Sequence, residues 1–214
     1  TTPVTEPTLL NASIIASTDV LCAGESSGTI NLTVIGGTTG YSYLWDDAAA
    51  STSEDLSGLE AGSYTVIVTD AAGCTATDNV IITEPSAITL TTIVLDPLCA
   101  SGSDGSVDLT VSGGTTGYTF NWSNGTSAED LAGIGSGSFT VTVTDAALCT
   151  STITAVLTEP AALTLTPTST TANCGQSDGS VDVTATGGTT NYGYLWSDAL
   201  ASTTSSVAGL PAGS

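Results

Sequence analysis

Five cysteines are the residues of this chain whose chemistry is easiest to specify. Cys22 and Cys74 have nearly the same separation as Cys99 and Cys149, and Cys174 has no partner at that separation in the remaining sequence. Paired cysteines form disulfides in an oxidising compartment. Metal ligation is the alternative, but the chain has no His and no Cys-x-x-Cys pair. The spacing therefore predicts the disulfides Cys22–Cys74 and Cys99–Cys149, with the partner of Cys174 beyond the end of this sequence.

Three adjacent acidic pairs are the candidates for catalysis, namely Asp46-Asp47, Glu54-Asp55 and Glu129-Asp130. Two carboxylates can hydrolyse a glycosidic bond when they converge on it. Adjacent residues of a strand point to opposite faces, so these pairs should not converge. The chain has no His or Lys to serve as a base, and a Ser nucleophile would lack an activating group. We therefore predict that the chain is not an enzyme and holds no catalytic residue.

Carboxylates could instead bind Ca²⁺, a hard cation that prefers oxygen ligands. A Cys99–Cys149 bond would bring Asp96 close to Asp145, and a Cys22–Cys74 bond would do the same for the equivalent pair. The alternative is that each Asp begins a turn by accepting hydrogen bonds from nearby backbone. No strict calcium-loop spacing is present. The candidate ligands for this cofactor are Asp19, Asp70, Asp96, Asp104 and Asp145.

The tryptophans Trp45, Trp122 and Trp196 could stack on sugars or pack in a core. Each follows another aromatic residue by two positions, so the two side chains share a strand face. A buried Trp packed on a disulfide between two sheets is typical of immunoglobulin-like sandwiches. This position favours the core for all three. Surface glycans stay a possible partner, through the exposed rings of Tyr41 or Tyr118.

These residues recur because the chain repeats itself about every 75 residues, which is typical of a tandem array. The Glu-Pro pairs begin at Glu6, Glu84 and Glu159, and Gly-Gly-Thr-Thr begins at Gly36, Gly113 and Gly187. We divide the chain into the tail of a preceding copy (1–7), a first copy (8–85), a second copy (86–160) and a C-terminally incomplete third copy (161–214). Neighbouring copies of the same polypeptide are then the main partners.

The second copy shows how these residues should be positioned. Apolar and polar residues alternate in short segments with turn residues every 8 to 12 positions, which is typical of β-strands. Asn124-Gly125 predicts a hairpin turn, and 127–137 predicts a short crossing segment. One face of each strand must be buried, so two sheets should stack. The expected core is Val107, Leu109, Val111, Phe120, Val141 and Val143. We predict an all-β chain of Ig-like β-sandwich repeats with one disulfide per repeat.

The charge of the chain excludes several partners. Among 214 residues, 21 are acidic and none is Lys, Arg or His, so the net charge is -21. Binding to nucleic acid or to an anionic membrane surface requires basic residues. No apolar segment reaches the roughly 18 residues that span a membrane. We therefore expect no nucleic acid partner and no membrane insertion.

The second copy combines four motifs, namely Gly113–Gly125, Glu129-Asp130-Leu131, Gly137–Ala146 and Cys149. In this combination it resembles the SprB-type repeat. The first copy matches through Tyr41–Trp45 and Gly62–Cys74, and the third through Tyr192–Trp196 and Gly209–Ser214. Glu-Asp-Leu is replaced in the third copy by Ser205-Ser206-Val207. Such repeats occur in very large cell-surface proteins of gliding Bacteroidota.

The resemblance implies secretion through the type IX route and display on the cell surface as an adhesin or filament. It implies no catalytic residue. The short joint at Glu84-Pro85 should limit bending, so an array would be a semi-rigid rod. We expect a structural stalk or filament segment of a secreted adhesin. Two alternatives are a self-assembling extracellular fibre, in which copies of the chain contact one another, and a carbohydrate-binding module.

Overall fold

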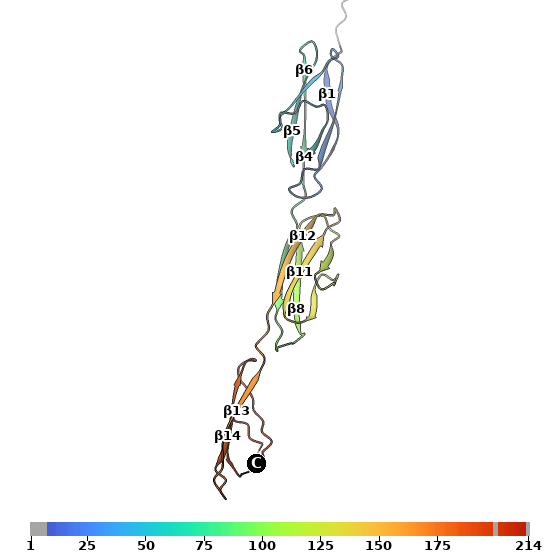
Figure 1. The fold of residues 1–214 in the computed structure, drawn as a ribbon. Coiled ribbons are helices and arrows are strands. Elements are labelled where there is room, and N and C mark those ends of the chain that lie inside the picture. The colour runs from blue at the N-terminus through green and yellow to red at the C-terminus, as the bar shows by residue number, and fades with distance from the viewer. Residues whose placement is uncertain (1–7, 199–200, 213–214) are drawn as a thin grey trace, which may run out of the picture. The chain divides into compact units, whose positions relative to one another are not determined.

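A computed structural model of the chain describes residues 8–198 and 201–212. The expected tail of a preceding copy, residues 1–7, lies outside the described residues. All regular elements of the described part are β-strands, which confirms the all-β prediction (Figure 1). By its contacts the chain divides into two compact units. The first contains the chain through Leu90 together with Val111–Thr119 and Thr142–Thr152, and the second contains the rest.

The first copy consists of two three-stranded antiparallel sheets. One has the order β1-β2-β4 and the other the order β3-β5-β6. Alternation of apolar and polar residues gives these strands one buried face, as β2 and β5 show. Their bounds are β1 Asn11–Thr18, β2 Gly28–Ile35, β3 Ser42–Trp45, β4 Leu56–Leu59, β5 Gly62–Thr69 and β6 Thr75–Ile82.

The second copy repeats this topology, with sheets of order β10-β8-β7 and β12-β11-β9. The expected crossing segment contains a strand, β10, which pairs with β8. Asn124-Gly125 forms a turn but no hairpin, because β9 before it and β10 after it belong to different sheets. The bounds are β7 Thr89–Leu95, β8 Gly105–Ser112, β9 Thr119–Trp122, β10 Leu131–Ile134, β11 Gly137–Thr144 and β12 Thr150–Leu157.

The third copy contributes one described sheet of order β13-β14-β15. Its strands are β13 Thr164–Thr170, β14 Gly179–Thr186 and β15 Ser206–Leu210. Three apolar side chains of this copy are exposed, namely those of Leu163, Leu165 and Leu195. The predicted boundaries of the three copies stay predictions.

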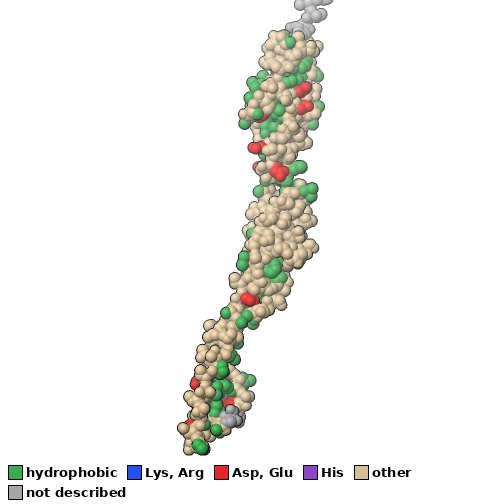
Figure 2. All heavy atoms as spheres, in the orientation of Figure 1, with side chains coloured by type: hydrophobic (Ala, Val, Ile, Leu, Met, Phe, Trp, Pro, Cys, Tyr) green, Lys and Arg blue, Asp and Glu red, His purple; other side chains and the backbone are tan. Residues whose placement is uncertain are grey.

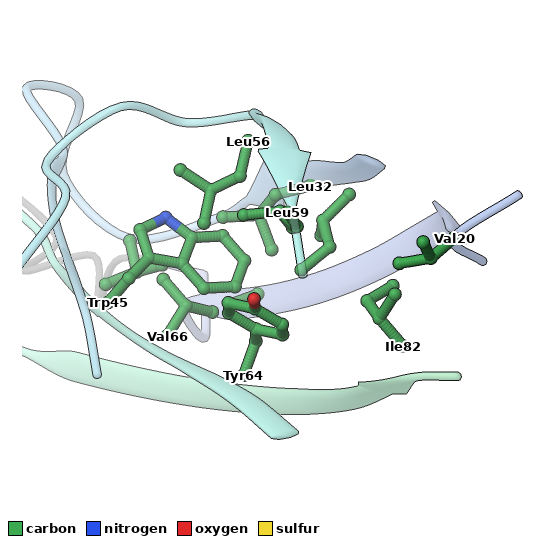
Figure 3. Packing of buried hydrophobic residues seen from close by; sticks show 11 residues of the cluster. Val20, Leu32, Trp45, Leu56, Leu59, Tyr64, Val66 and Ile82 are labelled. Atoms are coloured by element: carbon green, nitrogen blue, oxygen red, sulfur yellow. The ribbon is translucent and has the colours of Figure 1, made fainter. Parts of the chain in front are cut away.

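The core of the first copy lies between its two sheets. Trp45, Leu56, Tyr64 and Val66 face one another there (Figure 3). In the second copy the expected core residues Val107, Leu109, Val141 and Val143 are buried, each at most 3% exposed. Val111 and Phe120, which were expected with them, are half-buried. The sheets thus pack through alternate residues of each strand.

Candidate functional site at the junction of two copies

The single disulfide of the described residues joins consecutive copies. Cys22 of the first copy is bonded to Cys149 of the second, with Cα atoms 5.6 Å apart and a sequence separation of 127. Cys74, Cys99 and Cys174 are exposed free thiols. The predicted bonds Cys22–Cys74 and Cys99–Cys149 are therefore wrong, as is the prediction of one disulfide within each repeat. Both bonded cysteines belong to the same compact unit.

Strand direction explains why the predicted pairs do not form. Cys74 immediately precedes β6, whereas Thr83 follows that strand and bonds to Asp19 near Cys22. Eight residues of strand span about 26 Å, but a disulfide requires Cα atoms within roughly 7 Å. The two cysteines of a copy therefore lie at opposite ends of its last strand. The second copy repeats this arrangement, since Asp96 near Cys99 bonds to Thr158 at the far end of β12 from Cys149.

The loop that carries Cys22 is fixed to the segment that leaves the first copy. The amide of Val20 donates to the Thr83 carbonyl at 2.9 Å, and the Thr83 amide donates to Asp19 at 2.7 Å. Further along the loop, the Gly24 amide donates to the Glu84 carboxylate at 2.6 Å. This bond gives the recurring Glu-Pro pair a structural role that its sequence did not reveal. The loop is thereby held beside the joint.

The turn that carries Cys149 is organised by a buried carboxylate. Asp145 is 3% exposed, and its Oδ1 atom accepts the amides of Ala147 and Cys149 at 2.9 and 2.8 Å. Its Oδ2 atom accepts the Thr115 amide at 2.8 Å. The Thr115 amide, followed by those of Cys149 and Ala147, holds the pKa of Asp145 below its usual range, although burial acts in the opposite direction. Asp145 thus ties the Cys149 turn to the Gly113–Thr116 turn while staying ionised.

The disulfide itself is in contact with the first copy's loop. The Sγ atom of Cys149 lies 3.4 Å from the carbonyl oxygen of Leu21. This approach is a contact and not a hydrogen bond, because a disulfide sulfur carries no hydrogen. Leu148, next to Cys149, has a positive φ of 69° and is 80% exposed. The turn thus exposes the Leu148 side chain to solvent and directs Cys149 toward the first copy.

The five candidate calcium ligands bind backbone amides. Asp19 and Asp96 accept from residues that follow the last strand of their copies, and Asp104 accepts weakly from Leu98. Asp70 and Asp145 lie at the other end of that strand. The expected approach of Asp96 to Asp145 does not occur, because the Cys99–Cys149 bond on which it depended is absent. No group of three or more Cys, Asp or Glu in the described part of the chain is arranged to hold a metal ion.

The acidic pairs considered for catalysis have separate partners. Asp46 accepts the Thr65 amide at 2.7 Å, whereas Asp47 accepts the amide and hydroxyl of Ser51. In the motif Glu-Asp-Leu, the aspartates Asp55 and Asp130 each accept the amide of a strand residue, Leu32 and Leu109 respectively, at 2.9 Å. The four aspartates of these pairs therefore each bind the backbone amide of a different residue.

The tryptophans take different degrees of burial. Trp45 and Trp122 are 1% and 2% exposed, and each indole N–H donates to a backbone carbonyl, at Ser53 and Ala128. Trp196, in the third copy, is half-buried. No disulfide connects the two sheets of a described copy, so the expected packing of Trp on such a bond does not occur. Trp45 instead packs among aliphatic side chains (Figure 3).

Comparison with known families places these features in context. Three segments match the SprB repeat family, residues 14–50, 91–127 and 166–201, which together cover just over half of the chain. The chain is thus a tandem array of a recurrent surface-protein module. It belongs to the SprB repeat family. No curated protein matches its sequence.

Several solved structures of tandem Ig domains are similar to the chain. The N-terminal eight Ig domains of Down Syndrome Cell Adhesion Molecule align with 87% of this chain and 28% of that chain, at 15% identity and a TM-score of 0.48. A complex of Dpr2 Ig1-Ig2 with DIP-Theta Ig1-Ig3 aligns with 92% of this chain and 81% of that chain, at 10% identity and a TM-score of 0.32. Scores of this size carry no conclusion about function. Of the described residues, none forms a helix long and apolar enough to cross a membrane.

Proposed function

We propose that this chain is a non-catalytic structural segment of a stalk or filament in a large secreted bacterial surface adhesin. The observation that carries the proposal is the Cys22–Cys149 bond, which adds a second covalent connection between copies already joined through Glu84-Pro85. A peptide joint alone leaves several backbone dihedrals free, whereas a second connection restricts them. A segment that must hold adhesive parts away from a cell benefits from such a restriction.

The presence of a disulfide supports a secreted protein. Disulfides persist in oxidising compartments outside the cytoplasm. The net charge of the chain agrees with secretion. Its acidic side chains are scattered over the surface and no Lys or Arg offsets them, so their mutual repulsion keeps a long chain soluble (Figure 2). Membership of the SprB repeat family points the same way. An antibody raised against this chain should label intact cells of the source bacterium, and labelling only after lysis would contradict the proposal.

The stiffness of the joint can be measured with the thiols that the chain already has. Cys74 lies in the first copy and Cys99 in the second, and both are exposed. In a C174S background, spin labels on these two residues report the distance between copies. We expect a narrow distance distribution in the oxidised protein and a broad one in the C22S/C149S variant. Equally broad distributions would show that the bond does not restrain the joint and would contradict a stalk.

Sedimentation of the same unlabelled protein separates the stalk from a fibre. We expect monomers across a wide concentration range for a stalk segment. Growth into ordered polymers would favour the alternative in which copies of the chain assemble. Glycan recognition receives less support, because the hydroxyl groups of Tyr41 and Tyr118 donate to the carbonyls of Gly36 and Gly113 within their own turns.

A further inference from the structure

Three exposed thiols have no role in the junction described above. In each copy a loop cysteine follows the first strand (Cys22, Cys99, Cys174), and in the first two copies a turn cysteine precedes the last strand (Cys74, Cys149). The observed bond connects the loop cysteine of one copy to the turn cysteine of the next. We propose that this connection recurs at every joint, so that Cys74, Cys99 and Cys174 are bonding sites for neighbouring copies of the same repeat.

The turn of Cys74 has the same geometry as the bonded turn of Cys149. Asp70 accepts the amides of Ala72 and Cys74 at 2.9 and 2.8 Å and the Thr38 amide at 2.8 Å. Its own amide donates to the Cys74 carbonyl at 2.9 Å, as the Asp145 amide does to Cys149 at 3.0 Å. Asp70 is 5% exposed. The free thiol is thus presented by the framework that presents the bonded one.

The loop of Cys99 is likewise built as the loop of Cys22 is. The Ser101 amide donates to Glu159 at 2.7 Å, which matches the Gly24–Glu84 bond. Asp96 accepts the Thr158 amide at 2.8 Å, which matches the Asp19–Thr83 bond at 2.7 Å. The loop is therefore fixed to the chain that leaves the second copy, where a third copy begins.

The loop of Cys174 shares the position but not all of these bonds. The Asn173 amide donates to Asp178 at 2.8 Å, as the Leu98 amide donates more weakly to Asp104. Thr171 occupies the place of Asp19 and Asp96. Cys174 is exposed in this loop. Its partner under the same rule would be the turn cysteine of a fourth copy.

Pairing within a copy is excluded for the free thiols by the same geometry that excludes Cys22–Cys74. The loop and turn cysteines lie at opposite ends of an eight-residue strand. Neighbouring copies of the repeat are the remaining partners with a matching framework, and the existing junction supplies the precedent. This inference rests on the tandem arrangement in the proposed function, but not on the stalk being stiff.

Each new bond requires an oxidant of the disulfide class. One cysteine thiolate attacks a sulfur of a small disulfide such as oxidised glutathione and releases one thiolate. The second cysteine thiolate then attacks the mixed disulfide and releases the other. The two protons lost by the cysteines end on the two released thiols. One donor disulfide is thus reduced while one protein disulfide forms.

The experiment completes the third copy with the chain's own residues. Residues 207–214 match residues 131–138 of the second copy, so residues 139–160 can be appended after Ser214. This adds one turn cysteine, equivalent to Cys149. The unextended and extended chains are oxidised in a glutathione buffer, alkylated without reduction and weighed. Cleavage at Asp and Glu, the charged residues available, then identifies the bonded peptides.

We expect one disulfide and three alkylated thiols in the unextended chain. In the extended chain we expect a second disulfide between Cys99 and the appended cysteine, with Cys74 and Cys174 still alkylated. Changing the appended cysteine to serine should restore alkylation of Cys99. A bond from the appended cysteine to Cys174, or an alkylated Cys99 beside a free appended cysteine, would overturn the inference. A flexible joint in the spin-label measurement would contradict the stalk while leaving this pairing rule intact.

Discussion

Asp145 and Asp70 show how single residues organise the ends of a copy. Each is nearly buried, and each accepts three backbone amides. Buried carboxylates are stable as anions when such donors surround them. No basic side chain is present to take this part. In this chain the backbone therefore supplies the positive partners that Lys or Arg supply elsewhere.

The depressed pKa of Asp145 predicts a loss of stability in acid. Its pKa is lower in the fold than in the unfolded chain, where about 3.9 is usual. Its contribution is therefore complete above the unfolded value and disappears as the pH falls through the folded value. We expect the protection factors of the β11 and β12 amides, which are corrected for the intrinsic pH dependence of exchange, to fall below about pH 4. In the D145N variant these protection factors should be lower than in wild type at pH 7 and should depend less on pH below 4.

D108N provides the matched control, since Asp108 is exposed on β8 of the same copy. It removes one charge without removing backbone contacts, so exchange in β11 and β12 should keep the wild-type pH dependence. An unchanged pH dependence in D145N would contradict the role assigned to this carboxylate. Asn is an informative replacement because its amide group would point a donor toward one of the three N–H groups.

At the scale of elements, the turn after the second strand of each copy lies very close to the segment before the first strand. A Cβ atom added to Gly113 would lie 2.1 Å from the Ala87 carbonyl oxygen, and the residue has a φ of +77°. Gly36 and Gly187 have the same restriction in the other copies. Only glycine can place the backbone so close to the segment before the first strand. This explains why the first glycine of Gly-Gly-Thr-Thr recurs in all three copies.

Replacing Gly113 with Ala should therefore destabilise the second copy strongly. We expect a loss of about 3 kcal/mol or more, because strain from a positive φ of roughly 1–2 kcal/mol is joined by a clash with backbone. Calorimetry of the whole chain would show one transition moved to a lower temperature. G125A is the control, since Gly125 has a φ of +85° but no atom within 4 Å of an added Cβ. Equal shifts of the transition temperature in both variants would show that the close approach to the Ala87 carbonyl does not cause the loss of stability.

The alternation of apolar and polar residues along the strands was enough to predict the fold of each copy. It was not enough to predict the disulfide pairing. Val107, Leu109, Val141 and Val143 alternate with Thr or Asp and are buried, so their pattern was sufficient. Equal spacing of Cys22–Cys74 and Cys99–Cys149 suggested pairs within copies. Spacing along the chain, however, contains no information about which end of a strand a residue occupies.

A usable signal was nevertheless present in the positions of the cysteines. In copies joined in series, the first and last strands run in the same direction. A residue after the first strand then lies where the chain leaves, and a residue before the last strand lies where it enters. Contacts of Asp19 and Val20 with Thr83 show this arrangement. The roles of Glu84 and Asp145 depend on such contacts between distant segments, so their types alone could not reveal them.

At the scale of the whole molecule, the junction determines which part of the chain can be stretched. Force applied to the two ends passes from Cys22 to Cys149 without loading the residues between them. The bond thus removes 127 residue steps, or roughly 430 Å at about 3.4 Å per residue, from the extended length. Single-molecule pulling should show this shorter final length in the oxidised chain.

C22S should lengthen the fully extended chain by that amount, and C74S should not, because Cys74 is a free thiol. Adding a reductant to the oxidised wild type under load should release the same length in one step. If wild type and C22S reached equal lengths without reductant, the bond would be absent from the molecule in solution.

The junction also makes part of the backbone redundant. Between Cys22 and Cys149 the polypeptide and the sulfur bridge form a closed ring. A single break in the main chain inside that ring leaves both sides of the molecule attached. One cut anywhere in most of the first copy or most of the second therefore does not separate the chain into two pieces.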